Sequence, residues 1–201
     1  RAQNELVRQE IVEGLQDLMN RSSFILGSHV SEFEKEVAAY AHTHYAVGVS
    51  SGTDAQLLAL MALGVGPGDE VIIFSPYWVS YSEMVKLADG KSVLVQGAFD
   101  NNFKVTAEQF EAAITPKTKM VMFSSPNNPT GSVYTESELR DIANVVARHE
   151  NIFVLADEIY EYINFTQGGH FSIGSIPEIK DRVITVNGVA KGHAMTGLRI
   201  E

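Results

Sequence analysis

The sequence predicts an α/β fold, a mostly parallel seven-stranded sheet with helices on both faces, in a single domain that covers residues 1–201. Two observations predict it. Short runs of β-branched and other apolar residues alternate along the chain with segments whose apolar residues recur at helical spacing. No repeat, low-complexity tract or linker interrupts this alternation. Strands separated by helices need crossover connections, and those connections place helices on both faces of a parallel sheet.

The expected strands are short apolar runs, most of them bounded by turn residues. The run at 71–74, for example, follows a cluster of glycine, proline and aspartate at 64–69, which is a strong turn signal. The complete set comprises 45–49, 71–74, 92–96, 119–123, 152–156, 183–186 and 198–201. Strands this short and apolar are typical of a sheet that is buried on both faces.

The expected helices have apolar residues spaced so that they gather on one face. In the first, at 3–19, these residues are Leu6, Ile11, Leu15 and Leu18. The other helices are expected at 31–42, 55–63, 80–89, 106–113 and 135–148. Each would cover part of the sheet with its apolar face.

The composition excludes several classes of function. The chain has 25 acidic and 15 basic residues, a net charge of -10, which argues against a nucleic-acid partner. It has no cysteine, which excludes disulfides and thiolate metal sites and leaves the reducing cytoplasm as the expected compartment. Its apolar runs are far shorter than the ~20 residues that span a bilayer, so we expect no membrane partner.

Chemistry is expected at the carboxyl ends of the strands, because parallel α/β sheets bind their ligands there. Ser51, Gly52 and Thr53 follow the first expected strand and open a helix, whose free N–H groups favour an anion such as phosphate. An ordinary helix cap is the alternative. Trp78 follows the second expected strand and is the only tryptophan. It could stack on a flat heterocycle or pack in the core.

Polar residues also follow the next expected strands. Asn128 lies in a turn at 124–131 that contains two prolines and a glycine, and a rigid turn can hold an amide donor in place or be purely structural. Asp157 comes directly after the strand at 152–156, with Tyr160 three residues later. A buried carboxylate is costly unless it is paired, so Asp157 needs a cation, for which a protonated ring nitrogen would serve. A helix cap or an internal salt bridge is the alternative.

The last candidates follow the strand at 183–186. Lys191 lies among small and apolar residues, where desolvation would leave a neutral, reactive amine. Arg199, eight residues later, is a natural phosphate ligand. Because a lone lysine is usually a solvated surface residue, the functional interpretation depends on the combination of all these residues.

The combination resembles the class I and II aminotransferases, which are fold-type-I pyridoxal-phosphate enzymes. The strings that carry the resemblance are Ser-Pro-Asn-Asn-Pro-Thr-Gly at 125–131, Asp-Glu-Ile-Tyr at 157–160, and Val-Ala-Lys followed by Gly-Leu-Arg within 189–199. From about residue 75 the chain is most similar to the aspartate aminotransferase branch. The N-terminal third instead resembles the DegT/DnrJ/EryC1 sugar aminotransferases, for example in Val-Ser-Ser-Gly-Thr-Asp-Ala at 49–55. We therefore interpret the chain as a recombined, designed or minimised domain joined near Phe74 or Ser75.

The resemblance implies a role for each candidate residue. Lys191 would carry pyridoxal 5'-phosphate as a Schiff base and move a proton, and Asp157 would keep the ring nitrogen protonated. The contacts to the ring's phenolate oxygen, the ring face and the phosphate would come from Tyr160, Asn128, Trp78, Ser51, Gly52, Thr53 and Arg199. The family often has a hydroxyl residue three positions before the lysine. Gly188 stands there, so we expect no side-chain contact to the phosphate from that position.

The resemblance implies a transaminase that transfers an amino group between an amino acid, with aspartate and glutamate as candidates, and a 2-oxo acid. It also implies a homodimer. Full-length relatives are about twice as long, so we expect the large domain alone, without the C-terminal small domain. Two alternatives stay open. The chain could be a pyridoxal-phosphate domain with little or altered activity, such as racemisation or elimination, or with a sensor role, or it could bind another phosphate ligand at 51–53.

Overall fold

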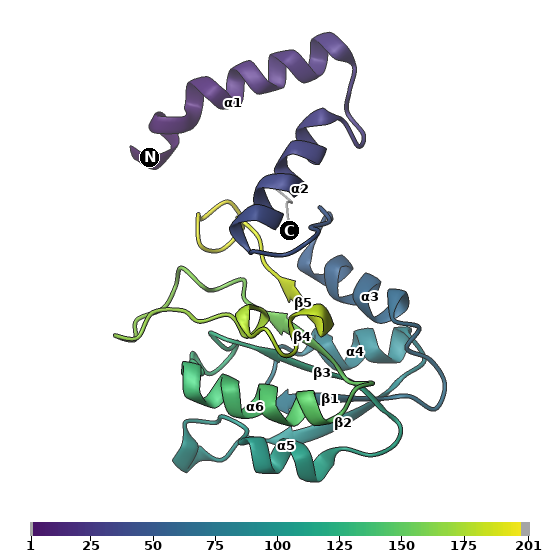
Figure 1. Cartoon of the computed structure of the whole chain (residues 1–201). Coiled ribbons are helices and arrows are strands. Elements are labelled where there is room, and N and C mark those ends of the chain that lie inside the picture. The colour runs from purple at the N-terminus through teal and green to yellow at the C-terminus, as the bar shows by residue number, and fades with distance from the viewer. Residues whose placement is uncertain (1, 198–201) are drawn as a thin grey trace. The chain divides into compact units, whose positions relative to one another are not determined.

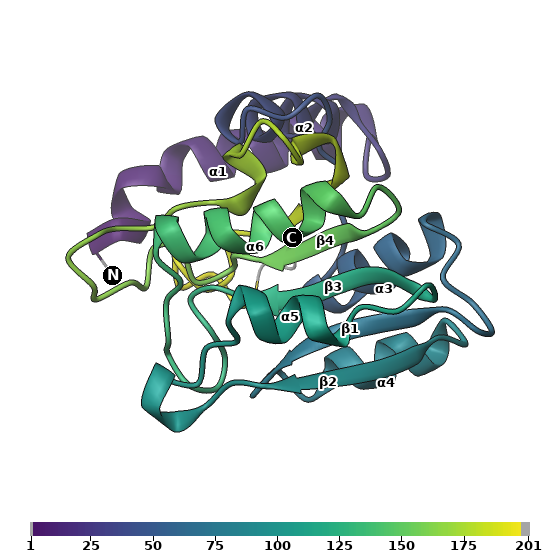
Figure 2. The ribbon, with the colours of Figure 1, turned by 60° about the horizontal axis from the view of Figure 1, so that its bottom comes forward.

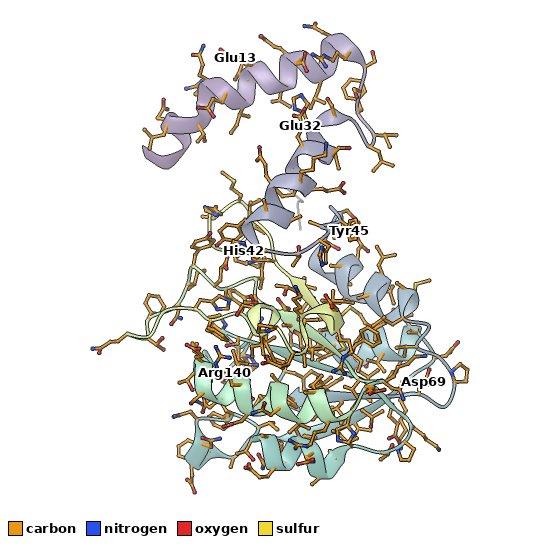
Figure 3. The ribbon with its side chains drawn as sticks, in the orientation of Figure 1. Glu13, Glu32, His42, Tyr45, Asp69 and Arg140 are labelled. Carbon is orange, nitrogen blue, oxygen red and sulfur yellow. The ribbon has the colours of Figure 1, made fainter. Side chains whose placement is uncertain are left out.

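The structure is a computed structural model that describes residues 2–197, in two compact units that comprise Arg1–Gly48 and Val49–Glu201. The first unit contains helices α1 (Ala2–Arg21) and α2 (Ser28–Tyr40). Ala38 is its only buried residue among those whose side chains are described. Apolar side chains of α1 such as Leu6 are exposed, as are Glu13 and Glu32 (Figure 3). This unit therefore buries little apolar surface of its own.

The second unit is built on a five-stranded sheet in which every neighbouring pair of strands is parallel (Figure 1). The strand order is β2-β1-β3-β4-β5. The strands are β1 (Glu70–Ser75), β2 (Lys91–Gln96), β3 (Thr118–Ser124), β4 (Phe153–Asp157) and β5 (Val183–Val186). The helices are α3 (Gly52–Ala62), α4 (Ser80–Leu87), α5 (Ala107–Ala113) and α6 (Glu136–Arg148), with the 3-10 helices η1 (Phe99–Asn101), η2 (Ile173–Ser175) and η3 (Lys180–Arg182). The parallel α/β architecture is confirmed.

Each face of the sheet has its own apolar core, because successive strand residues point to opposite faces. In β1, Val71 and Ile73 pack with α3 and α4, whereas Ile72 and Phe74 pack with α5 and α6. Figure 2 shows the two pairs of helices on opposite sides of the sheet. Both faces are thus covered, as the sequence predicts.

One of the seven expected strands is absent within residues 2–197. The segment 45–49 is irregular, and Tyr45 and Val47 are 88% and 75% exposed. The amide of Gly48 donates to the side chain of Glu34 at 2.9 Å instead of pairing with a strand. The last expected strand, 198–201, lies outside the described residues.

None of the helices within residues 2–197 combines the length and the apolarity that a membrane span requires.

Candidate functional site

Most of the predicted site residues lie at one edge of the sheet, because parallel strands all end on the same side. β1 leads into the segment that holds Trp78, β3 into the turn that holds Asn128, and β4 into Tyr160. α3 begins with Gly52 directly after Ser51, its N-cap.

Asp157 is the last residue of β4 and is only 6% exposed. Its Oδ2 accepts hydrogen bonds from the Tyr81 hydroxyl at 2.7 Å and from Nε2 of Gln56 at 2.9 Å. Its Oδ1 accepts from the backbone N–H of Ile159 at 3.3 Å. Two of these three donors come from helices α4 and α3, which lie 76 and 101 positions away in the chain. Three donors and no acceptor face this carboxylate, an arrangement that suits an ionised aspartate.

Burial raises the pKa of Asp157 above its ordinary value, with a smaller contribution from the nearby charge of Glu158. The hydrogen bonds from Tyr81, Ile159 and Gln56 act in the opposite direction but do not cancel that rise. Within residues 2–197 no Lys, Arg or His forms an ion pair with Asp157. A protonated ring nitrogen would supply the positive partner charge that the buried carboxylate of Asp157 lacks. This residue therefore fits a pyridinium partner.

Tyr160 and Asn128 are brought together, as the resemblance implies. Nδ2 of Asn128 lies 3.4 Å from the Tyr160 hydroxyl, to which it donates. The turn that carries Asn128 is held by its neighbour Asn127, whose Nδ2 donates to Ser124 Oγ at 3.1 Å and to the carbonyl of Pro76 at 3.2 Å. The rigid turn therefore holds the amide of Asn128 beside the phenol of Tyr160, which comes from the segment after β4.

Trp78 is partly buried at the carboxyl end of β1 and belongs to an aromatic group. Its ring meets that of Tyr81 edge-on, with the centroids 5.9 Å apart, and Tyr77 stacks on Tyr81 at 6.3 Å. The Tyr81 ring thus contacts Trp78 while its hydroxyl binds Asp157. This places the indole near the buried carboxylate.

Ser51 caps α3, as one of the two sequence interpretations has it. Its Oγ accepts from the backbone N–H of Asp54 at 3.1 Å and donates to the Asp54 carboxylate at 2.9 Å, and Ser50 Oγ also donates to that carboxylate. The amides of Gly52 and Thr53 have no acceptor within the helix, because the first turn of any helix lacks one. These amides, rather than the serine hydroxyls, are the groups that an anion could use.

Lys191 lies in a turn after β5, and its side chain is exposed, so the expected desolvation is wrong for this structure. The turn is closed by a hydrogen bond from the amide of Ala194 to the Lys191 carbonyl at 3.1 Å. It packs against the segment after β4, since a Cβ at Gly192 would lie 2.8 Å from the Tyr162 ring. Small neighbours here indicate a close chain approach, not a buried lysine. Arg199 lies outside the described residues.

Two residues that hold Asp157 were not among the sequence candidates. Tyr81 belongs to the string Ser-Pro-Tyr-Trp-Val-Ser-Tyr at 75–81, and Gln56 lies one turn into α3. The sequence does contain a signal for these two residues. Each is a polar side chain in the first turn of an expected helix, on the face that packs against the sheet. Gln56 is 1% exposed, and a buried amide needs a hydrogen-bond partner, which its Nε2 finds in Asp157.

Comparisons with known proteins identify the family of the chain. The family model described as "Aminotransferase class I and II" matches residues 2–200, on both sides of the join expected near residues 74 and 75, and no comparison tests that join. An aspartate aminotransferase of Bacillus sp. (strain YM-2) is 49% identical over 162 residues, which are 80% of this chain and 41% of that protein. A bifunctional aspartate aminotransferase and glutamate/aspartate-prephenate aminotransferase of Petunia hybrida is 39% identical over 181 residues, 90% of this chain and 38% of that protein.

A solved structure has the same fold. The crystal structure of the aspartate aminotransferase from Rhizobium meliloti superposes with a TM-score of 0.85 at 32% identity, over 96% of this chain and 50% of that one. The chain thus spans about 40% of the length of the two relatives named above.

Proposed function

Because this chain belongs to the class I and II aminotransferase family, we propose that it is the cofactor-binding part of a pyridoxal-phosphate-dependent aminotransferase. The observation that carries the proposal is Asp157, a buried carboxylate with three hydrogen-bond donors and no ion pair within the described residues. The curated relatives are named as aspartate or aspartate/prephenate aminotransferases, which supports this reaction class.

Different residues at the edge of the sheet contact different parts of the cofactor. Asp157 holds the ring nitrogen in its protonated form, and Tyr160 with Asn128 donates to the ring's phenolate oxygen. Trp78 covers one face of the ring. The amides of Gly52 and Thr53, at the start of α3 beside Ser51, hold the phosphate together with Arg199.

Lys191 provides the amine that attaches the cofactor and that carries a proton to and from the substrate's α-carbon. When bound, pyridoxal phosphate supplies an electron sink for that carbon.

The proposed substrates are an amino acid, with aspartate and glutamate first, and a 2-oxo acid. A homodimer is proposed as well. It is supported by the first unit, where Leu6, Phe24, Ile25 and Leu26 are each more than 65% exposed and would gain from burial against a partner. The cytoplasmic compartment stays a prediction.

The exposure of Lys191 favours a second candidate, a domain that binds pyridoxal phosphate with little turnover. The two candidates differ in one half-reaction. An active chain converts bound cofactor to its amino form when L-aspartate or L-glutamate is added, whereas a binder keeps an unchanged absorbance spectrum.

Attachment is tested by incubating the chain with pyridoxal phosphate, reducing it with borohydride and mapping the modified peptide. We expect the label on Lys191, its loss in Lys191→Ala, and its retention in the matched control Lys180→Ala, which removes another exposed lysine. A label on a different lysine would refute the assignment of Lys191.

A further inference from the structure

A second carboxylate is buried directly beside Asp157, on the other face of the sheet. Glu158 is 4% exposed. The partners of Asp157 come from α3 and α4, whereas those of Glu158 are His170 and Ser172, which lie just before η2. Adjacent residues of an extended chain point to opposite faces, so fixing the Glu158 side chain also fixes the backbone from which Asp157 projects.

Both carboxylate oxygens of Glu158 and its backbone N–H form hydrogen bonds. Its Oε2 lies 2.9 Å from Nε2 of His170, and its Oε1 accepts from the Ser172 hydroxyl at 2.8 Å. Its backbone N–H donates to the carbonyl of Val186 in β5 at 2.8 Å. We call Glu158, His170 and Ser172 the Glu158 clamp. A buried carboxylate is stable only with such partners, so the clamp persists while its charges are balanced.

The imidazole of His170, when protonated, supplies that balance. Burial alone lowers the pKa of His170, but the hydrogen bond to Glu158 and the charges of Glu158 and Glu161 outweigh it, and the pKa is raised above 6.5. These two glutamates are the groups that act on His170. A raised histidine pKa means that the stabilisation is fully present below about 6.5 and is lost as the pH rises through the folded-state value.

The clamp closes a loop that carries a site residue. Glu158 begins the segment 158–172 and His170 lies near its end. Between them, the amide of Glu161 donates to the Glu158 carbonyl at 2.9 Å and the amide of Ile163 donates to the Tyr160 carbonyl at 2.8 Å. This short turn at the start of the loop sets the direction of the Tyr160 side chain, which meets Asn128.

We propose that His170 is a positioning residue that, through the buried Glu158, closes the loop 158–172 and holds Tyr160 and Asp157 in place for the cofactor. The proposal rests on the proposed function for the identity of that cofactor. The clamp itself belongs to the cofactor-free chain and can be tested there.

The first test uses the whole chain without cofactor. His170→Gln keeps an N–H donor but removes the charge, and His149→Gln is the matched control, because His149 follows α6 at the opposite end of β4. Hydrogen exchange of the Glu161 and Ile163 amides should become about tenfold faster in His170→Gln, the effect of losing one charge-assisted hydrogen bond. Exchange in β3 should stay unchanged, and the control should match the original chain at both places. Equal exchange at Glu161 and Ile163 in all three chains would overturn the proposal.

A second measurement requires no substitution at His170, so it does not depend on whether a His170 variant folds. In a nuclear magnetic resonance titration, the imidazole of His170 should titrate at a higher pH in the original chain than in Glu158→Gln. The same titration pH in both chains would mean that the pair does not form.

The third test adds pyridoxal phosphate and measures its dissociation constant from pH 6 to pH 10. We expect His170→Gln to bind about tenfold more weakly than the original chain at pH 6.5. The ratio should approach one at high pH, where the imidazole of His170 in the original chain is neutral and residue 170 therefore carries no charge in either chain. A purely structural histidine would give a ratio that does not change with pH, and that result would contradict the proposal. If the original chain does not bind the cofactor at all, the proposed function fails, while the exchange and titration experiments still judge the clamp.

Discussion

Tyr81→Phe tests how the buried charge of Asp157 is supported. The substitution removes one hydroxyl, which donates to Asp157 Oδ2 at 2.7 Å, and it leaves the ring packed against Trp78 and Tyr77. A hydrogen bond to a charged group contributes about 1.5–3 kcal/mol, against about 0.5–1.5 kcal/mol for a neutral pair. We expect a loss of unfolding free energy of about 2 kcal/mol at pH 8.5, where a larger fraction of Asp157 is ionised than at acidic pH.

The loss should shrink toward about 1 kcal/mol at pH 4.5, because the raised pKa of Asp157 favours its protonated form at acidic pH more than an ordinary aspartate's pKa would. Tyr134→Phe is the matched control. The Tyr134 ring is also buried, but its hydroxyl pairs with the backbone of Val105, accepting from the amide at 2.8 Å. Urea unfolding at both pH values measures the four penalties. If Tyr81→Phe shows the same pH-independent penalty as Tyr134→Phe, Tyr81 does not support a charge on Asp157.

Three further predictions address the buried carboxylate, a helix start and a close backbone approach. Asp157→Asn should stabilise the cofactor-free chain at pH 8 by about 1 kcal/mol, because it removes a buried charge that has no ion-pair partner, and it should weaken pyridoxal phosphate binding at least a hundredfold. Denaturation measures the first effect and a binding titration the second. A destabilised chain with normal affinity would contradict both expectations. Glu138→Gln should cost about 1 kcal/mol at pH 7, because Glu138 completes the capping box of α6 and pairs with Lys104. Burial opposes the lowering of the Glu138 pKa, but the bonds to Lys104 and the cap prevail, so the cost should vanish as the pH falls below 4.5, and a constant cost in thermal melts would argue against it. Gly97→Ala should destabilise the chain by about 1–3 kcal/mol, as the new Cβ would lie 2.1 Å from the carbonyl oxygen of Phe103, and an unchanged melting temperature would disprove that contact.

Local patterns were sufficient to predict the helices and the core strands. Apolar spacing located α6, and short apolar runs between turn signals located β1 and β4. They failed at 45–49, which has the composition of a buried strand but pairs with no strand within residues 2–197. Strand pairing is a contact between distant parts of the chain, and the composition of one segment does not contain it.

The sequence predicted some features of the candidate site and missed others. The position of Asp157 after a buried strand correctly indicated a buried carboxylate, but its donors Tyr81 and Gln56 lie on two helices far away in the sequence. The small residues around Lys191 suggested burial, whereas they allow the turn to approach Tyr162 and leave the lysine exposed. Neighbours in sequence describe the backbone path better than they describe side-chain solvation.

The most direct measurement is the protonation state of the ring nitrogen of bound pyridoxal phosphate, read from the nitrogen chemical shift of ¹⁵N-labelled cofactor at pH 8. If the buried charge of Asp157 holds a cationic ring, that nitrogen is protonated in the original chain and unprotonated in Asp157→Asn. A nitrogen that is unprotonated in the original chain, or that keeps its proton in the variant, would contradict the account.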